Sequence, residues 1–213
     1  MEARSTLSTW WPFVRGLLRA PRSVGAIAPS SPWLVNAVLE PARISQAKTL
    51  VEFGPGTGAL TGEIIRRLSA DARLFAFEID TVFVANLRAR YRDPRVTFIA
   101  ASAADSPQYL ARLGFPAVDC VVSSLPLTVL PQQLTHRIMQ ATTECLRPGG
   151  IFVTYQFSTA FARPVLQSYF PQTRRTRFVL ANLPPAIVFA CRKEAEAVHP
   201  WAPEACLVGD AAC

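Results

Sequence analysis

Short apolar runs alternate with amphipathic stretches between Lys48 and Phe170, and this alternation restricts the fold more than any other feature of the sequence. Runs rich in Val, Leu, Ile and Phe predict strands, and the stretches that follow them have the periodicity of helices. Strands and helices that alternate at this spacing form a parallel sheet with helices on both faces. We therefore predict strands at 49–53, 74–77, 96–100, 119–123 and 151–156, and helices at 59–68, 81–91, 107–113, 131–146 and 160–170.

The two ends of this region follow other patterns. Ser31-Pro32 predicts a helix start, because serine caps helices and proline suits the first helical position, and the helix is expected to stop before Pro41. Near the other end, strands are predicted at 177–180 and 186–191, and two strands without an intervening helix form an antiparallel hairpin. The remaining predicted boundaries are Asp80 as the cap of helix 81–91 and Pro148-Gly149-Gly150 as the turn after helix 131–146.

The composition indicates one folded domain with a charged appendage. The 213 residues are 50% hydrophobic and 17% charged, which is enough apolar material for a large core. The formal net charge of +7 comes almost wholly from arginine. A basic chain favours phosphate-bearing partners, either nucleic acid or an anionic membrane surface, and the charge alone does not choose between them. Residues 194–213 are acidic and contain no lysine or arginine, and we expect them to form a flexible tail.

Cysteine use and hydropathy bear on location. The five cysteines form no Cys-x-x-Cys pair and have no histidine at metal-ligand spacing, which argues for a reducing compartment and against a disulfide frame or a zinc site. No apolar run is long and uninterrupted enough to span a membrane, and the N-terminus lacks the apolar segment of a signal peptide. The sequence therefore predicts a cytoplasmic protein without a metal or a transmembrane segment, whose membrane contacts are peripheral.

The beginning of the chain contains an amphipathic segment. In a helix over residues 10–20, Trp10, Phe13 and Leu17 share one face and arginines line another. An apolar face, tryptophan and an arginine stripe are typical of a helix in the headgroup region of a bilayer. A helix packed on its own domain, with a solvated basic edge, explains the pattern equally well. The residues of the membrane interpretation are Trp10, Trp11, Phe13, Arg15, Arg19 and Arg22.

A glycine-rich loop joins the first predicted strand to its helix. Residues 51–58 read VEFGPGTG, and glycines at alternate positions let the backbone turn sharply and approach a ligand at a helix N-terminus. Glu52 precedes the first glycine by two residues, which suits a ligand with an amino group. Glu78, at the end of the second predicted strand, can bind ribose hydroxyls. S-adenosylmethionine has both groups, whereas a nicotinamide dinucleotide lacks the amino group.

Loop, acids and terminal hairpin together resemble the class I S-adenosylmethionine-dependent methyltransferases over residues 48–192. The resemblance implies a Rossmann-like, mostly parallel seven-stranded sheet, with S-adenosylmethionine as methyl donor and S-adenosylhomocysteine as product. Related enzymes often carry Gly-Asp-Ala after the third strand, where this chain has Ser102 in the place of the aspartate, and Asp105 is interpreted as a cap of the next helix. The implied cofactor-binding residues are Glu52, Gly54, Gly56, Thr57, Gly58, Glu78, Ile79, Ser102, Ala103 and Ser123.

The sequence Ser-Leu-Pro-Leu at 124–127 follows the fourth predicted strand. Methyltransferases that act on exocyclic amines carry a polar-x-Pro-aromatic motif here, in which a carbonyl and a polar side chain hold the amine and the ring stacks on a base. Leu127 replaces the aromatic residue, which disfavours a nucleobase because stacking contributes about 1–3 kcal/mol per base. We predict Tyr155 as an aromatic wall or hydrogen-bond partner for the amine, with Tyr169 and His136 as weaker candidates. The predicted catalytic residues are Ser124, Leu125, Pro126 and Tyr155.

Three motifs together resemble the bacterial phospholipid N-methyltransferases over nearly the whole chain: 24–31, the Ser-Leu-Pro-Leu stretch, and 182–186. This resemblance implies stepwise methylation of phosphatidylethanolamine, and of its mono- and dimethyl forms, toward phosphatidylcholine at the inner face of the cytoplasmic membrane. It divides the chain into a membrane-docking or lid segment at 1–30, a methyltransferase domain at 31–193 and the acidic tail at 194–213. The candidates for the lipid phosphate are Ser30, Ser31, Arg22, Arg174, Arg175 and Arg177.

Two other functions stay open at this point. An adenine N6-methyltransferase that acts on RNA has the same fold and suits the same charge, with Leu127 and the tryptophan-rich start against it. A catalytically idle membrane-binding protein has the fold without the activity. The intact acids and glycines of the loop weigh against this last interpretation.

Overall fold

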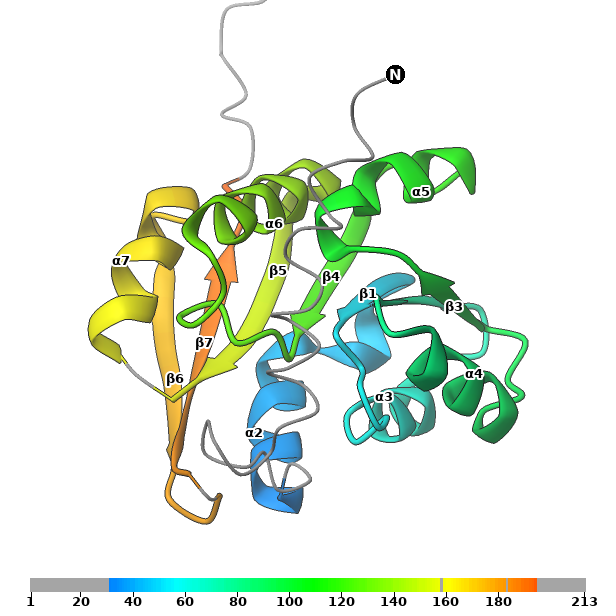
Figure 1. Cartoon of the computed structure of the whole chain (residues 1–213), viewed down its shortest axis with the longest axis horizontal. Coiled ribbons are helices and arrows are strands. Elements are labelled where there is room, and N and C mark those ends of the chain that lie inside the picture. The colour runs from blue at the N-terminus through cyan, green and yellow to red at the C-terminus, as the bar shows by residue number, and fades with distance from the viewer. Residues whose placement is uncertain (1–30, 158, 183, 195–213) are drawn as a thin grey trace, which may run out of the picture.

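Alternating strands and helices form one seven-stranded sheet in the computed structural model (Figure 1), which describes residues 31–157, 159–182 and 184–194. The strand order is β3-β2-β1-β4-β5-β7-β6. Neighbours are parallel from β3 to β5, and β7 runs antiparallel to both β5 and β6. The predicted sheet with its C-terminal hairpin is therefore confirmed. The strands are β1 (Thr49–Phe53), β2 (Arg73–Glu78), β3 (Val96–Ala100), β4 (Val118–Ser123), β5 (Leu146–Gln156), β6 (Thr173–Val179) and β7 (Ala186–Arg192).

Helices cover both faces of the sheet, as the alternation predicts (Figure 1). On one face, Val51 and Phe53 of β1 belong to a core with residues of α5, α6 and α7. On the other face, Leu50 packs with α2 and α3, and α4 packs against β2 and β3. The helices are α2 (Pro32–Ala42), α3 (Thr61–Arg67), α4 (Thr81–Arg90), α5 (Ser106–Arg112), α6 (Gln132–Cys145) and α7 (Thr159–Tyr169), with 3-10 turns η1 (Ile44–Gln46) and η2 (Ala103–Asp105).

The three residues predicted as helix caps all occupy N-cap positions, and two of them cap through their side chains. The Ser31 hydroxyl accepts a hydrogen bond from the Leu34 amide (3.2 Å), and the Asp80 carboxylate accepts one from the Val82 amide (2.8 Å). These bonds satisfy amides that have no partner inside their helices. Asp105 precedes α5 but forms no side-chain cap, and its carboxylate pairs instead with Arg137 of α6 (3.2 Å). Asp105 therefore occupies the predicted cap position of α5, but without the side-chain hydrogen bond of a cap.

The first helix was predicted to stop before Pro41, but it continues to Ala42. Pro41 lies in the last turn, where its missing N–H removes one helical hydrogen bond without breaking a long helix in its middle. The helix ends at Arg43, whose φ of 48° is left-handed and whose amide donates to the Glu40 carbonyl.

Two strands, β5 and β6, begin five and four residues earlier than predicted. β5 begins at Leu146, which pairs with Val118, and the glycine turn after it is part of the sheet because the Gly149 amide donates to the Lys193 carbonyl (3.0 Å). β6 begins at Thr173 rather than at residue 177. It is an edge strand whose first half consists of threonines and arginines, so it lacks the apolar alternation by which strands are predicted.

The predicted helix at 10–20, Ser30 and the tail beyond residue 194 lie outside the described residues. None of the helices in the described part of the chain has the length and hydropathy needed to cross a membrane.

Candidate cofactor and substrate site

The site lies at the carboxyl ends of β1 and β4. β1 has β2 on one side and β4 on the other, so the order of the parallel strands reverses there, and open α/β sheets bind their ligands outside the strand ends at such a point. The loops after the two strands meet at this edge, because the Ser124 amide donates to the Phe53 carbonyl (3.0 Å). Residues from the predicted cofactor loop and the predicted reacting loop are thus adjacent.

The glycine bend after β1 has a left-handed backbone at Gly54 (φ 68°) and Gly56 (φ 54°). A Cβ at Gly54 would lie 2.7 Å from the Cδ2 atom of Leu125, so a larger residue would displace this side chain and would also strain the left-handed backbone. A Cβ at Gly56 would meet nothing within 4 Å among the described residues. The bend therefore packs against the reacting loop on one side and presents an open backbone on the other.

Glu78, at the end of β2, connects the glycine bend to the next strand. Its buried carboxylate accepts hydrogen bonds from the Gly56 amide and the Asp80 amide, both at 3.0 Å. Burial raises the pKa of Glu78, although these amide bonds act in the opposite direction. A carboxylate has about four acceptor positions, so Glu78 retains capacity for the ribose hydroxyls that its sequence position predicts.

Glu52 is fully buried on β1 and has one carboxylate oxygen without a partner. Its Oε2 atom accepts a hydrogen bond from the Thr61 hydroxyl (2.8 Å), while Oε1 has no hydrogen-bond partner among the described residues. Burial, with a smaller contribution from the charge of Glu78, raises the pKa of Glu52 to about 8. A buried unpaired acceptor is costly, and a cationic amino group would satisfy both its charge and its hydrogen bond. The acids and the open glycine backbone therefore fit S-adenosylmethionine.

The other predicted cofactor residues lie at strand ends of the same edge. Ser102 is buried after β3, and its hydroxyl accepts a hydrogen bond from the Ala104 amide (3.2 Å). Ala103 is buried at the start of η2, and Ile79 packs against the core after β2. Thr57 is exposed in the glycine loop. Gly58 is enclosed by α4, because its carbonyl accepts from the Tyr91 hydroxyl (3.0 Å).

The reacting loop after β4 is held by hydrogen bonds on both sides. The buried Ser123 hydroxyl accepts from the Leu125 amide (3.2 Å). The Leu125 carbonyl accepts two hydrogen bonds at 2.9 Å, from the Leu127 amide and from Nε2 of Gln156. Both acceptor positions of this carbonyl are therefore used. Gln156, at the end of β5, is buried and was not predicted as a site residue, because the sequence does not reveal that it reaches the loop after β4.

The side chains of Leu127 and Tyr155 both belong to the core. Leu127 is 5% exposed and packs in the core cluster of the α6 and α7 face, so it offers no surface to a substrate. Tyr155 is buried on the opposite face, in the core cluster that includes α2, and its ring meets Phe157 edge-on. Pro126 belongs to the reacting loop, and its carbonyl accepts hydrogen bonds from the Val129 amide (3.0 Å) and the Leu130 amide (3.2 Å).

His136 and Tyr169 contact each other. The His136 Nδ1 atom and the Tyr169 hydroxyl are 2.5 Å apart, which connects α6 to α7 at an exposed position. Burial raises the pKa of the Tyr169 phenol. This pair has the geometry of an interhelical hydrogen bond. Among the described residues, no three His, Cys, Asp or Glu side chains converge as ligands for a metal.

Comparison with known proteins agrees with this geometry. A family model described as a methyltransferase domain matches residues 50–150. An ornithine lipid N-methyltransferase from Singulisphaera acidiphila is 30% identical over 172 residues, which cover 80% of this chain and 88% of that protein. A ribosomal RNA small subunit methyltransferase A from Aromatoleum aromaticum is 31% identical over 118 residues, or 55% of this chain and 42% of that protein.

Among solved structures, the N-methyltransferase NodS from Bradyrhizobium japonicum WM9, in complex with S-adenosylhomocysteine, superposes with a TM-score of 0.61. The match covers 84% of this chain and 97% of that one at 14% identity, which shows the shared fold. Fold, site and sequence similarity agree on one class of enzyme. The chain belongs to the class I S-adenosylmethionine-dependent methyltransferases.

Proposed function

We propose that this chain methylates the amine of a membrane lipid, namely phosphatidylethanolamine and its partly methylated forms, toward phosphatidylcholine. The observation that carries the proposal is the reacting loop, which has the polar and carbonyl groups of an amine site but a buried leucine where base methyltransferases have a stacking ring. The relative whose name specifies a lipid substrate matches most of both chains. Its substrate is named as ornithine lipid, which also presents a primary alkylamine.

The cofactor is assigned to the glycine bend and its two acids. Glu52 would hold the amino group through Oε1, Glu78 would hold the ribose hydroxyls, and Gly56 would provide the close backbone approach. Ser102 and Ala103 at the end of β3 are assigned to the adenine. When bound, S-adenosylmethionine supplies an electrophilic methyl carbon on a sulfonium, and its transfer leaves S-adenosylhomocysteine.

The amine must be neutral to attack, because only the free lone pair is a nucleophile. A primary alkylamine has an ordinary pKa near that of lysine, about 10.4, and desolvation beside the buried loop lowers it. We assign the Ser124 hydroxyl and carbonyl to the orientation of this amine. The Leu125 carbonyl already accepts two hydrogen bonds, so its role in the proposal is to fix the loop through Gln156. Alignment of the lone pair with the methyl carbon then provides much of the rate.

The lipid substrate determines the remaining assignments. Residues 1–30 are proposed as the membrane-docking or lid segment, residues 31–193 as the methyltransferase domain and residues 194–213 as the acidic tail. The N-terminus of α2 at Ser31 is assigned to the lipid phosphate, since free backbone amides and the helix dipole favour an anion there. The enzyme would act at the inner face of the cytoplasmic membrane. Tyr155, buried in the core of the α2 face, is assigned to packing rather than to an aromatic wall.

RNA adenine methylation is the second candidate, because ribosomal RNA methyltransferases match half of the chain. The chain spans 42% of that relative, and the buried Leu127 offers no ring for stacking on adenine. These two observations favour a lipid amine over adenine in RNA as the substrate.

Incubation with methyl-labelled S-adenosylmethionine separates these substrates. Separate reactions would contain phosphatidylethanolamine, ornithine lipid, phosphatidylcholine or total RNA, with the lipids in detergent micelles. We expect label in phosphatidylethanolamine and none in phosphatidylcholine, which has no free amine. Label confined to ornithine lipid would identify ornithine lipid, and not phosphatidylethanolamine, as the substrate. Label confined to RNA would overturn the lipid proposal.

A further inference from the structure

Three large apolar side chains lie exposed beside one another at the carboxyl edge of the sheet. Trp33 in the first turn of α2 is 69% exposed, and Phe178 and Leu180 at the end of β6 are 54% and 72% exposed. All three line one shallow groove of about 360 Å³. In Figure 1 the start of α2 and the tip of the β6–β7 hairpin lie together at the bottom of the molecule. Such a cluster on a folded domain indicates an interaction surface.

The elements that carry this cluster are fixed to each other. The Ser31 amide donates to Oδ1 of Asn182 in the hairpin loop (3.2 Å), and Arg177 of β6 pairs with Glu40 of α2 (2.8 Å). Asn182 is itself buried and donates to the Pro184 carbonyl (2.8 Å). These bonds hold the start of α2 against the hairpin, so the three apolar side chains form one preorganised surface.

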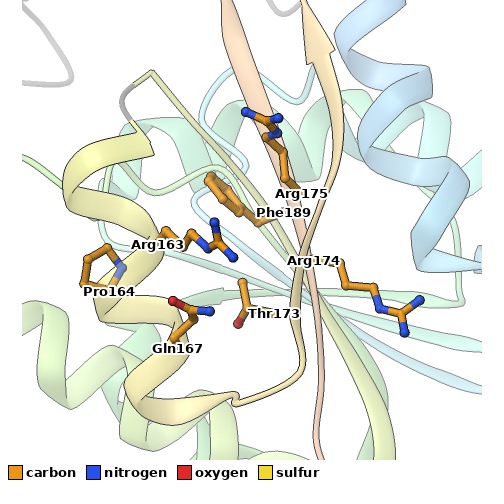
Figure 2. A pocket seen from close by; sticks show the side chains of 7 residues that line it. All are labelled: Arg163, Pro164, Gln167, Thr173, Arg174, Arg175 and Phe189. Carbon is orange, nitrogen blue, oxygen red and sulfur yellow. The ribbon is translucent and has the colours of Figure 1, made fainter.

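A basic groove lies beside the same edge strand, nearer the start of β6. It has a volume of about 810 Å³ between α7 and β6, with Arg163 on the helix, Arg175 on the strand and the buried ring of Phe189 in its floor (Figure 2). Arg174 projects from the opposite side of β6 (Figure 2). Arg163, Arg174 and Arg175 have no ion-pair partner within the described part of the chain, and no carboxylate lies between residues 147 and 193 of the sequence.

We propose that the tip of this edge, called the β6 surface below, docks on an anionic phospholipid bilayer. It consists of Trp33, Phe178 and Leu180, with Arg163 and Arg175 on one side of β6 and Arg174 on the other. The apolar side chains enter the interface, and the arginines contact phosphate groups. A strand rises about 3.3 Å per residue, so Arg175 lies roughly 17 Å behind Leu180 along the strand, and its long side chain reaches toward the headgroup layer. The inference rests on the proposed function only in its choice of partner.

The geometry favours a bilayer over RNA or another protein. Leucine neither stacks on bases nor hydrogen-bonds to them, whereas exposed apolar groups next to unpaired arginines complement an anionic lipid surface in both hydropathy and charge. The cluster also lies at the carboxyl edge, where the reacting loop is. Docking through it would turn the site toward lipid amines, through residues that lie outside the segment 1–30.

Bromolipid quenching tests this contact directly. In the full chain with Trp10, Trp11 and Trp201 changed to Phe, Trp33 is the only tryptophan, because the sequence contains four. With anionic vesicles that carry brominated acyl chains, we expect strong quenching of Trp33 fluorescence. Vesicles that bind the protein without quenching Trp33 would overturn the proposal.

Paired substitutions measure the contribution of each part. Leu180→Ser is expected to weaken binding to anionic vesicles about tenfold, from the lost burial of one large apolar side chain. Leu113→Ser is the matched control, because Leu113 is also exposed (45%). It lies after α5 and shortly before the amino end of β4, whereas Leu180 lies at the carboxyl ends of the parallel strands. Arg175→Gln is expected to weaken binding about fivefold, in a salt-dependent manner. Equal binding of the Leu180 and Leu113 variants, with unchanged melting temperatures, would overturn the assignment.

Two further results decide against the bilayer. A dimer of the wild type that Leu180→Ser dissociates would assign the surface to a second copy, and RNA retention that Arg175→Gln abolishes would assign it to nucleic acid. Methylation of micellar lipid is measured separately. Methylation of micellar lipid without quenching of Trp33 would support the proposed function and refute the docking surface. Quenching of Trp33 without methylation of lipid would support the docking surface and refute the proposed function.

Discussion

Cofactor binding is expected to release a proton from Glu52. Its carboxyl group has a pKa of about 8 in the folded protein because it is buried, so it is protonated in about nine-tenths of molecules at pH 7. An ammonium group against Oε1 favours the ionised form. Binding of S-adenosylhomocysteine, which keeps the amino group and does not react, should therefore release about 0.9 protons per ligand at pH 7.

The same linkage gives the affinity a pH dependence. Between pH 6 and pH 7 the ionised fraction of a group with a pKa of about 8 rises about tenfold, and the association constant should rise by the same factor. Isothermal titration in buffers of different ionisation enthalpy measures the released protons. Glu52→Gln is the control and should bind weakly with little proton release. A wild type that releases no proton at pH 7, or a Glu52→Gln variant that releases as many, would refute the assignment of Glu52 to the amino group.

Further predictions concern stability and the glycine bend. The pKa of Glu52 is raised from 4.5 to about 8 on folding, so protonation of this carboxyl group stabilises the folded state. This stabilisation is fully present below pH 4.5, and between pH 4.5 and about pH 8 the free energy of unfolding should fall by about 1.4 kcal/mol per pH unit. In urea unfolding, the stability of Glu52→Gln relative to the wild type should therefore increase as the pH rises over that range. Parallel pH profiles of the two proteins would contradict this. Gly54→Ala should lower the free energy of unfolding by about 1–3 kcal/mol, since its Cβ would meet Leu125, whereas Gly56→Ala should cost about 1 kcal/mol and mainly abolish S-adenosylhomocysteine binding. Equal unfolding midpoints for the two variants would contradict this difference. Burial alone would raise the pKa of Asp119, but hydrogen bonds from Arg147 and from the Thr49 and Lys48 amides hold it below its usual value, so the stability that they confer is present near neutral pH and lost in acid. Asp119→Asn should flatten the acid limb of the unfolding profile, and an unchanged limb would refute it.

The sheet and its helices follow from the sequence because their signals are local. Apolar runs such as Thr49–Phe53 alternate with amphipathic helices, and Ser31 and Asp80 cap helices through bonds to residues only a few positions away. The boundary at Pro41 was missed because a proline in the last turn removes only one bond. The start of β6 was missed because an edge strand needs no apolar alternation, and its arginines resemble a loop.

The candidate site was predictable in its residues but not in its contacts. The spacing of the glycines and acids identifies the cofactor loop, since backbone approach and paired charges need those residue types. That Leu127 is buried, and that Gln156 occupies the Leu125 carbonyl, depends on how β4 and β5 pair. The exposed cluster of Trp33, Phe178 and Leu180 brings together residues about 145 positions apart, which no local pattern reveals.

Lipid mass spectrometry of a bacterial host that makes phosphatidylethanolamine but no phosphatidylcholine tests the central claim most directly. Cells that express the wild-type chain are expected to accumulate mono-, di- and trimethylated phosphatidylethanolamine, and cells that express Glu52→Gln at equal protein level are expected to lack them. An unchanged lipid profile in cells with folded wild-type protein that binds S-adenosylhomocysteine would contradict the account.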